Sequence, residues 1–440
     1  MKNEITNLCQ WALEETLKKG ATACKVSLYK SKFVDISYRE HKPEALKEAT
    51  TKSIWIDIYI DGRYSSQGTP DLRKASLEKF IEKACQNTGF IEQDPFRSLP
   101  DKKYIGTGFS DTLNTFDPQL STFSPDEKHE LVKQIEESCL ARGGSKVISV
   151  QAGANFSEDE EFIVASNGFT GSNKSTSVWM GASMSAQDEG DRRPNGNFWV
   201  GSRFVGDLPS ATLVGENAAD RTLRLMGAKK LPTETLPVIV ENRVAGRLLS
   251  GFLAGFMGGN IQQKRSFLLD KIGQPVASPK FSIIDNPLLP KGLNSRLYDY
   301  DGFASKKRTF LNNGVVEDFF IDWYYSRKLN CEPTTGSRSN LIVPPGTLSV
   351  GQLMKKAGRG ILITDFIGGN SNSTTGDFSL GVIGQLFENG VPVQAIAEMN
   401  MADNHLLFWN KIEELGNDPW IYGGWQSPSI MFNDVVVAGV

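Results

Sequence analysis

The stretch 242–257 constrains the fold more than any other part of the chain. Large apolar residues are spaced there so that they cover more than half of a helix circumference, and small residues fill the positions between them. The large residues are Val244, Leu248, Leu249, Phe252, Leu253, Phe256 and Met257. A helix that is apolar nearly all round belongs inside a protein, and each isolated glycine weakens it by ~1 kcal/mol relative to alanine. We therefore expect a buried helix 242–257 that depends on packing for its stability.

The length of the chain and one short segment together predict the domain organisation. With 440 residues, the chain is too long for one simple core. Residues 227–232 are basic and are interrupted by glycine and proline, which favours a boundary there. Helix and strand patterns mix before this segment, and strand patterns dominate after it. The sequence therefore predicts an α+β protein, with a mixed α/β N-terminal domain (1–228) and a β-rich C-terminal domain (232–440) that contains the helix 242–257.

Periodicity places the main elements of the N-terminal domain. Apolar residues at helical spacing predict helices, and runs of aromatic and β-branched residues predict strands. The expected helices are 5–19, 69–86, 124–141 and 210–226, and the expected strands are 23–29, 33–38, 53–60, 146–152, 161–166 and 170–184. The Asn167-Gly168 pair predicts a hairpin turn between the last two strands. Residues 89–122 predict a long surface connection, and the sequence does not decide whether it is ordered.

Charge and cysteine usage exclude several classes of partner. The 48 basic and 51 acidic residues nearly balance, so no basic surface for nucleic acid is expected. The five cysteines are widely spaced without a C-x-x-C pair, which is typical of reduced thiols. The chain begins with a charged helix pattern and has no apolar run near the ~18 residues that span a bilayer. We expect a cytoplasmic protein without a membrane or direct nucleic-acid partner.

Local motifs for catalysis or metal binding are absent from the sequence. None of the three histidines, His41, His129 and His405, has a second histidine three or four residues away, so each is expected to be a surface or capping residue. The patterns G-x-S-x-G and G-x-x-x-x-G-K-[ST] do not occur. Cys331 with a distant histidine remains a weaker catalytic alternative.

Eight short blocks, in order along nearly the whole chain, resemble the TldD/PmbA family and specifically its PmbA (TldE) branch. They are DGR at 61–63, KRSFL at 264–268 within 242–271, TGSRSNL at 335–341, PG at 345–346, GILIT at 360–364, TGDFS at 375–379, ENG at 388–390 and SPS at 427–429. The resemblance implies a mixed α/β domain followed by a β-rich domain, and subunits that pair around a cleft for unfolded peptide.

The same resemblance implies that this chain lacks the family's metal site. The catalytic branch carries an H-E-x-x-x-H helix that binds zinc, and its alignment here places the two histidines at Leu249 and Ala254 and the glutamate at Ser250. None of these three side chains can bind zinc or act as a general base toward a zinc-bound water. The resemblance therefore implies no catalytic residue, no metal ligand and no cofactor in this chain, with zinc expected in a partner subunit.

Four residues are candidates for the peptide cleft or for a subunit contact. They are Arg338, Gly368, Gly369 and Asp377, all within or near the blocks that resemble the family. A local structural role is an equal alternative: Arg338 in a surface ion pair, Asp377 in a hairpin turn, and the glycines in a turn that needs positive φ.

Two functions stay open at this point. The first is a PmbA/TldE-like subunit of a metallopeptidase that degrades unfolded peptides, non-catalytic alone and dependent on a zinc-bearing TldD-like partner in a heterodimer. The second is a non-enzymatic peptide-binding or regulatory homodimer of the gyrase-modulator type.

Overall fold

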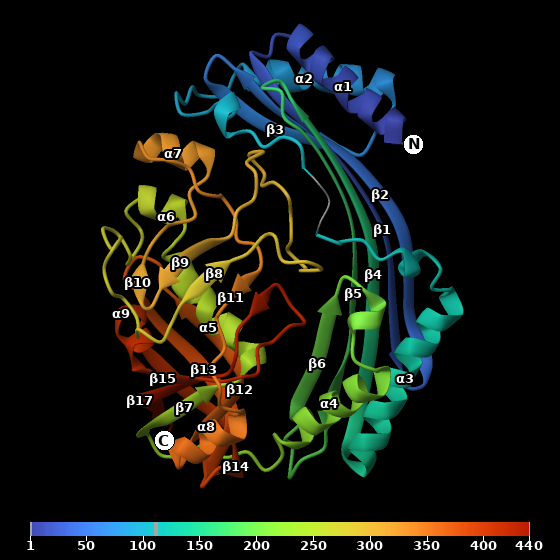
Figure 1. Ribbon diagram of the computed structural model, residues 1–440. Helices are drawn as coiled ribbons and strands as arrows, with labels where there is room; N and C mark the ends of the chain where they lie inside the picture. Colours follow the sequence, from blue (N-terminus) through green and yellow to red (C-terminus); the bar gives the residue numbers. More distant parts are fainter. Residues whose placement is uncertain (1, 110–112, 440) are drawn as a thin grey trace.

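A long curved sheet forms the N-terminal half of the protein in the computed structural model, which describes residues 2–109 and 113–439. Its six antiparallel strands lie in the order β3-β2-β1-β4-β5-β6. They are β1 (Ala23–Arg39), β2 (Lys42–Ile60), β3 (Arg63–Thr69), β4 (Val147–Ala165), β5 (Thr170–Ala186) and β6 (Asn195–Ser202). The sheet curves along one side of the C-terminal half (Figure 1).

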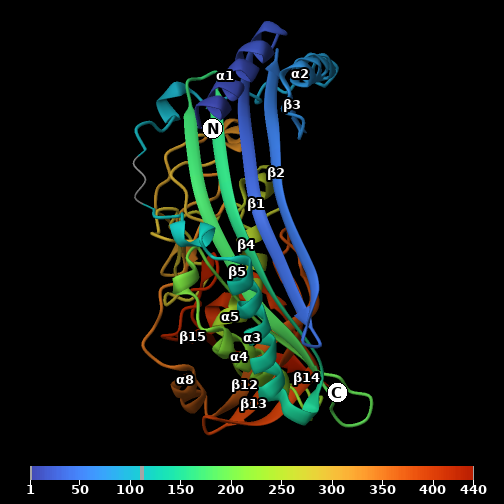
Figure 2. The same cartoon turned by 90° about the vertical axis from the view of Figure 1, so that its right-hand side faces the viewer.

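Two pairs of helices pack on opposite ends of this sheet and form two separate cores. Figure 2 shows α1 (Lys2–Lys18) and α2 (Lys74–Thr88) at one end, with α3 (Pro125–Gly143) and α4 (Ala211–Leu223) toward the other. The helix α3 begins with a capping box, in which the Ser124 side chain accepts from the backbone N–H of Glu127 while the Glu127 carboxylate accepts from that of Ser124. These helices agree with the predicted ones to within a few residues at most ends.

The strands are longer than the sequence predicted. The two expected strands 23–29 and 33–38 form one continuous strand of 17 residues, and 53–60 is only the second half of β2. The reason is that the middle of β1 pairs with polar segments of β2 and β4, which have no alternating apolar pattern. The predicted hairpin is confirmed, with Val164 opposite Thr170 across the Asn167-Gly168 turn.

The first part of the connection 89–122 runs along the C-terminal half, and its last part packs on the N-terminal sheet. It contains the short helices η1 (Lys102–Tyr104) and η2 (Pro118–Ser121), and residues 110–112 within it lie outside the described part. Tyr324 donates to the Asp94 carboxylate at 2.6 Å, and the indole N–H of Trp323 donates to Ser98 at 3.0 Å. Asp94 and Ser98 are therefore held by side chains from the C-terminal half, whereas the backbone N–H of Asp117 donates to Thr176 of the N-terminal sheet.

Two sheets build the C-terminal half. The larger has the strand order β14-β13-β12-β7-β17-β15, and an additional pairing of β14 with β17 closes it on itself. Its strands are β7 (Glu234–Val240), β12 (Arg359–Ser371), β13 (Asp377–Glu388), β14 (Val391–Asn404), β15 (Ile412–Leu415) and β17 (Ile430–Ala438). The smaller, in the order β10-β9-β8-β11-β16, has β8 (Ile283–Asp285), β9 (Arg308–Asn312), β10 (Val315–Val316), β11 (Leu341–Ile342) and β16 (Trp425–Gln426).

Short helices complete this half. They are α5 (Asn242–Ala254), α6 (Gly258–Gln262), α7 (Trp323–Leu329), α8 (Val350–Ala357) and α9 (His405–Phe408), and the remaining 3₁₀ turns of the chain are η3 (Gly144–Lys146), η4 (Val205–Asp207) and η5 (Trp409–Lys411). Within the described residues, no helix is long and apolar enough to cross a bilayer.

The helix α5 confirms most of the central prediction from the sequence. Leu248, Phe252 and Leu253 are almost fully buried in the largest core of the protein. The helix ends at Ala254 rather than at 257, because Met257 is extended and forms a bridge with Phe320. One face of the helix is open rather than buried.

Candidate functional site

A groove of about 340 Å³ lies between the open face of α5 and the end of β12. The helix contributes Arg247, Leu248, Ser250, Gly251 and Ala254, and the strands and α9 contribute Gly369, Asn370, Ser371, Phe378, Leu380 and His405. The small residues of α5 let β12 and α9 approach the helix closely. A Cβ added to Gly251 would lie 2.8 Å from both Ser371 Oγ and His405 Nε2. Glycine at this position is therefore required by close approach, not by backbone conformation.

The positions aligned with the family's metal motif are divided between the groove and the core. Ser250 is exposed and Ala254 is half-buried, and both line the groove. Leu249 is only 3% exposed and packs in the core behind it. Two of these three positions thus face the same open space, where they present a hydroxyl and a methyl group.

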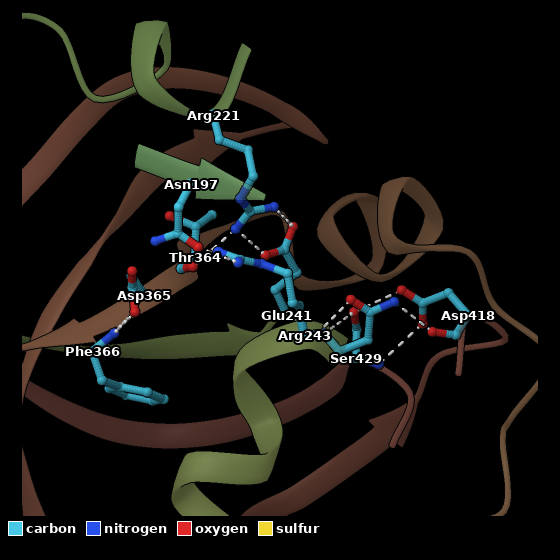
Figure 3. A network of polar contacts seen from close by, with 10 residues as sticks. Asn197, Arg221, Glu241, Arg243, Thr364, Asp365, Phe366, Asp418 and Ser429 are labelled. Atoms are coloured by element: carbon cyan, nitrogen blue, oxygen red, sulfur yellow. Dashed lines mark hydrogen bonds and ion pairs between the residues drawn. The ribbon is translucent and has the colours of Figure 1, made fainter. Parts of the chain in front are cut away.

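One side of β12 has no strand neighbour beyond residue 363 in the described chain. The strand β7 pairs with β12 only over 361–363. Farther along, Arg221 donates to the carbonyl of Thr364, and Arg247 donates to the carbonyls of Phe366 and Gly368. Figure 3 shows the first part of this edge, including the Asp365 carboxylate that accepts from the N–H of Phe366. Side chains therefore donate to the backbone carbonyls that a neighbouring strand would otherwise pair with.

His405 corrects a prediction from the sequence, because it is a buried residue and not a surface or capping one. It does begin α9, but its ring is 1% exposed and stacks on Phe267 and Phe378 with centroid separations of 5.4 and 4.8 Å. The indole N–H of Trp409 donates to Nδ1 at 3.1 Å, and Nε2 lies 2.9 Å from Ser371 Oγ. Burial lowers the pKa of His405 to about 4.

These contacts determine where the proton of His405 lies. An indole N–H is only a donor, so Nδ1 must be the acceptor and the neutral ring carries its proton on Nε2. That proton points to Ser371 Oγ, and the imidazole cannot at the same time take a proton from this hydroxyl. The pair does not work as a nucleophile with its base, and the hydroxyl of Ser371 keeps its own proton to donate.

The residues of the groove do not fit a metal ion. Both nitrogens of the one imidazole are engaged, by Trp409 and by Ser371, and the groove face of α5 offers no imidazole or carboxylate. Among the described residues, no group of three or more His, Cys, Asp or Glu side chains is placed to hold a metal. No step through a metal can be assigned to these side chains.

The predicted cleft residues lie in different places. Gly369 lines the groove, and its neighbour Gly368 bears the carbonyl that Arg247 binds. At this bulge of β12, φ is +55° at Gly368 and +90° at Gly369. Asp377 begins β13 beside the groove, where Thr375 and Asn404 donate to its carboxylate at 2.7 and 2.9 Å and lower its pKa.

Arg338 does not line the groove. Its guanidinium lies 5.2 Å from the ring centroid of Trp425, and no ion pair of Arg338 occurs among the described residues. The structure thus places a cation–π contact where one alternative expected a surface ion pair. Cys331 lies at the surface of the protein. Partial desolvation of its thiol, together with the nearby carboxylates, raises its pKa, so the thiolate that a nucleophile needs is disfavoured.

Sequence reasoning missed Arg247, Ser371 and the buried state of His405. The Asn-His-Leu sequence at 404–406 is typical of a helix start, and nothing local indicates that Phe267, Phe378 and Trp409 surround the ring. The one local indication was the glycine at 251, because a residue without a side chain lets another group approach the helix closely.

The fold and this groove define a class: a two-part α+β protein with the architecture of a metallopeptidase family but without fitting metal ligands in its groove. Family models for the PmbA/TldA metallopeptidase central domain and C-terminal domain match residues 118–226 and 233–439. The chain belongs to the TldD/PmbA family.

Individual relatives cover almost the whole chain. The metalloprotease PmbA of Escherichia coli O157:H7 is 27% identical over 94% of this chain and 92% of its own. A solved structure from Bacteroides thetaiotaomicron, named as a proposed modulator of DNA gyrase, is 34% identical with a TM-score of 0.96 and 99% coverage of both chains. TldE from Thermococcus kodakarensis, 18% identical, shares the fold with a TM-score of 0.86 over 99% of this chain and 100% of its own.

Proposed function

We propose that this chain is a PmbA/TldE-like subunit of a TldD/PmbA-type metallopeptidase that degrades unfolded peptides in the cytoplasm. The chain supplies a peptide-binding groove, and a zinc-bearing TldD-like partner supplies the metal and the activated water. One observation carries the proposal: the groove between α5 and β12 holds Ser250 and Ala254 at the motif positions, next to a strand edge without a strand neighbour among the described residues.

The edge of β12 supports an extended peptide as the ligand. A peptide that adds to a sheet edge binds through main-chain hydrogen bonds, so it needs no particular sequence. Its N–H groups can replace the guanidinium of Arg247 on the carbonyls of Phe366 and Gly368. The free hydroxyl proton of Ser371 can donate to a peptide carbonyl at the far end of the groove. An unfolded chain offers such backbone groups, whereas a folded one has them paired.

The dependence on a partner rests on the chemistry of the groove. Peptide hydrolysis needs an activated water or nucleophile, and the proton on His405 Nε2 prevents this ring from activating Ser371. The bound peptide therefore has to meet a catalytic group from another subunit.

Reconstitution tests this proposal. The full-length chain is mixed with a family member that carries H-E-x-x-x-H, and complex mass and cleavage of a fluorogenic unfolded peptide are measured. We expect a heteromer whose turnover falls when Ser250→Trp fills the groove, while Lys83→Trp on the exposed face of α2 leaves it unchanged. Absence of a complex, or turnover that does not depend on this chain, would contradict the proposal.

A regulatory homodimer is the second candidate. It is favoured by the 34% identity to a protein named for a proposed modulation of DNA gyrase. Capture of the tagged chain from native lysate separates the two candidates. Recovery of a paralogue with the histidine motif supports the peptidase subunit, and recovery of only a second copy of this chain supports the homodimer.

A further inference from the structure

A second, smaller pocket lies along the same helix and strand as the groove, at the junction of the two halves of the protein. It is lined by the start of α5, the middle of β12, the start of β6 and the end of α4. Arg243 lies one helical turn before Arg247, and Thr364 and Asp365 directly precede Phe366 on β12. The Arg247 guanidinium, bound to the carbonyls of Phe366 and Gly368, lies between the two pockets, so a peptide that displaces it would fill one trench between α5 and β12.

Three arginines line this junction pocket, and two of them lack a carboxylate partner in the described chain. Arg221 already has a carboxylate partner, because its guanidinium donates to Glu241 at 2.9 and 2.6 Å and also to the carbonyl of Thr364 at 3.0 Å. Arg224 is exposed and has no ion pair among the described residues. Arg243 donates to Asn197 Oδ1 at 3.0 Å, as Figure 3 shows, but its buried Nε has no partner in the described part.

The charge of this pocket favours an anion. The carboxylate of Asp365 also lines it and Glu241 pairs with Arg221, so the three guanidinium groups exceed these two carboxylates by one positive charge. Arg243 remains charged near neutral pH, since burial lowers its pKa only to about 10. A buried guanidinium with an unpartnered N–H is stabilised by an anionic acceptor.

The size and position of the pocket limit what the anion can be. Its free volume is about 20 Å³, which accommodates one or two oxygen atoms but no large side chain. It lies at the end of the trench that the proposed peptide would fill. We propose that the junction pocket binds the C-terminal carboxylate of a peptide that lies antiparallel to β12, with Arg224 and Arg243 as the ligands of the carboxylate. This inference rests on the proposed peptide-binding function.

The direction of the peptide follows from the geometry. The pocket adjoins Thr364, and the groove ends at Ser371, so a carboxylate in the pocket requires a chain that runs opposite to β12. At roughly 3.3 Å per residue, the distance along β12 from 364 to 370 corresponds to about six peptide residues. The peptide would therefore present a segment about six residues from its C-terminus near Ser250 and Ala254.

Binding of two matched peptides to the full-length chain tests this inference. The probes are a fluorescein-labelled octapeptide of alternating threonine and alanine with a free C-terminal carboxylate, and the same octapeptide as its amide. Anisotropy is measured for the wild type, Arg224→Gln, Arg243→Gln and the control Lys83→Gln, which removes the same charge from α2. Thermal melts check that each variant folds; Arg224 is exposed, so its variant keeps the test valid if Arg243→Gln does not fold.

We expect the free carboxylate to bind about tenfold or more tightly than the amide in the wild type and in Lys83→Gln. Arg224→Gln and Arg243→Gln should each lower the affinity for the free-acid peptide toward that for the amide peptide. The affinity for the amide peptide should stay unchanged. Equal binding of acid and amide, or a difference that survives in the arginine variants, overturns the inference but leaves the groove function standing. Binding of neither peptide, or binding that Ser250→Trp does not change, overturns the groove function and this inference with it.

Discussion

At the scale of the residue, the contacts of His405 decide what the groove can do. Trp409 donates to one ring nitrogen, Ser371 lies at the other, and the four aromatic rings of Phe252, Phe267, Phe378 and Trp409 pack against the imidazole. A histidine in this environment stays neutral and positions a hydroxyl. The sequence did not predict the burial of His405, because Phe252, Phe267 and Phe378, which pack against its ring, are distant in the chain.

Buried neutral His405 makes stability depend on pH. Its pKa is about 4 in the folded protein against an unfolded value of about 6.5, so the unfolded chain binds the proton more readily. Stability from this group is present above the unfolded pKa and is lost as pH falls from 6.5 toward 4. Between pH 7 and pH 5 we expect a loss of roughly 2 kcal/mol from this residue. Urea unfolding at the two pH values should show it in the wild type but not in His405→Gln.

His41→Asn is the matched control for this titration. His41 is exposed and has a φ of +59°, which asparagine tolerates, so this variant should keep the pH dependence of the wild type. If His405→Gln retained the full loss between pH 7 and pH 5, another group would be its source.

The glycine at 251 gives a second prediction at this scale. In Gly251→Ala, the new methyl group meets Ser371 and His405 at 2.8 Å, which should outweigh the gain of ~1 kcal/mol in helix propensity. We expect net destabilisation by about 1 kcal/mol or more, measured by urea unfolding at pH 7. Gly351→Ala in α8, where a Cβ meets nothing within 4 Å, should stabilise the protein instead. Equal effects of the two substitutions would show that packing around Gly251 is not tight.

At the scale of the element, α5 and the unpaired edge of β12 form two walls of the groove. Periodicity predicted α5 because its apolar residues are local in sequence, and the core confirms it. The edge could not be predicted: that β7 stops pairing at 363 and that Arg247 covers the carbonyls beyond it are facts of tertiary arrangement.

Removal of the side chain that covers the edge should expose it. In Arg247→Met, the carbonyls of Phe366 and Gly368 lose their donor while the apolar contacts of the side chain stem are largely kept. We expect tighter binding of the amidated octapeptide, by a few-fold, and a stability loss of about 1 kcal/mol. Anisotropy and urea unfolding measure the two effects, with Lys83→Met as the control. Weaker binding of the amide would mean that Arg247 contacts the peptide instead of competing with it.

At the scale of the whole molecule, the junction pocket depends on both halves of the chain, whereas the groove is lined by the C-terminal half alone. Strand β6 and helix α4 of the N-terminal half complete the pocket that α5 and β12 begin. The α+β class followed from the sequence, but strands of 17 to 19 residues did not, since their polar middle sections carry no apolar alternation. Of the four predicted cleft residues, Gly369 lines the groove and Gly368 adjoins it, whereas Asp377 lies beside the groove and Arg338 outside it.

Metal content and turnover of the isolated full-length chain, measured together after purification without chelator, decide whether this chain needs a zinc-bearing partner. We expect less than stoichiometric zinc and no cleavage of unfolded peptide until a family member with H-E-x-x-x-H is added. One zinc per chain, with peptide cleavage by the chain alone that a chelator abolishes and zinc restores, would contradict it.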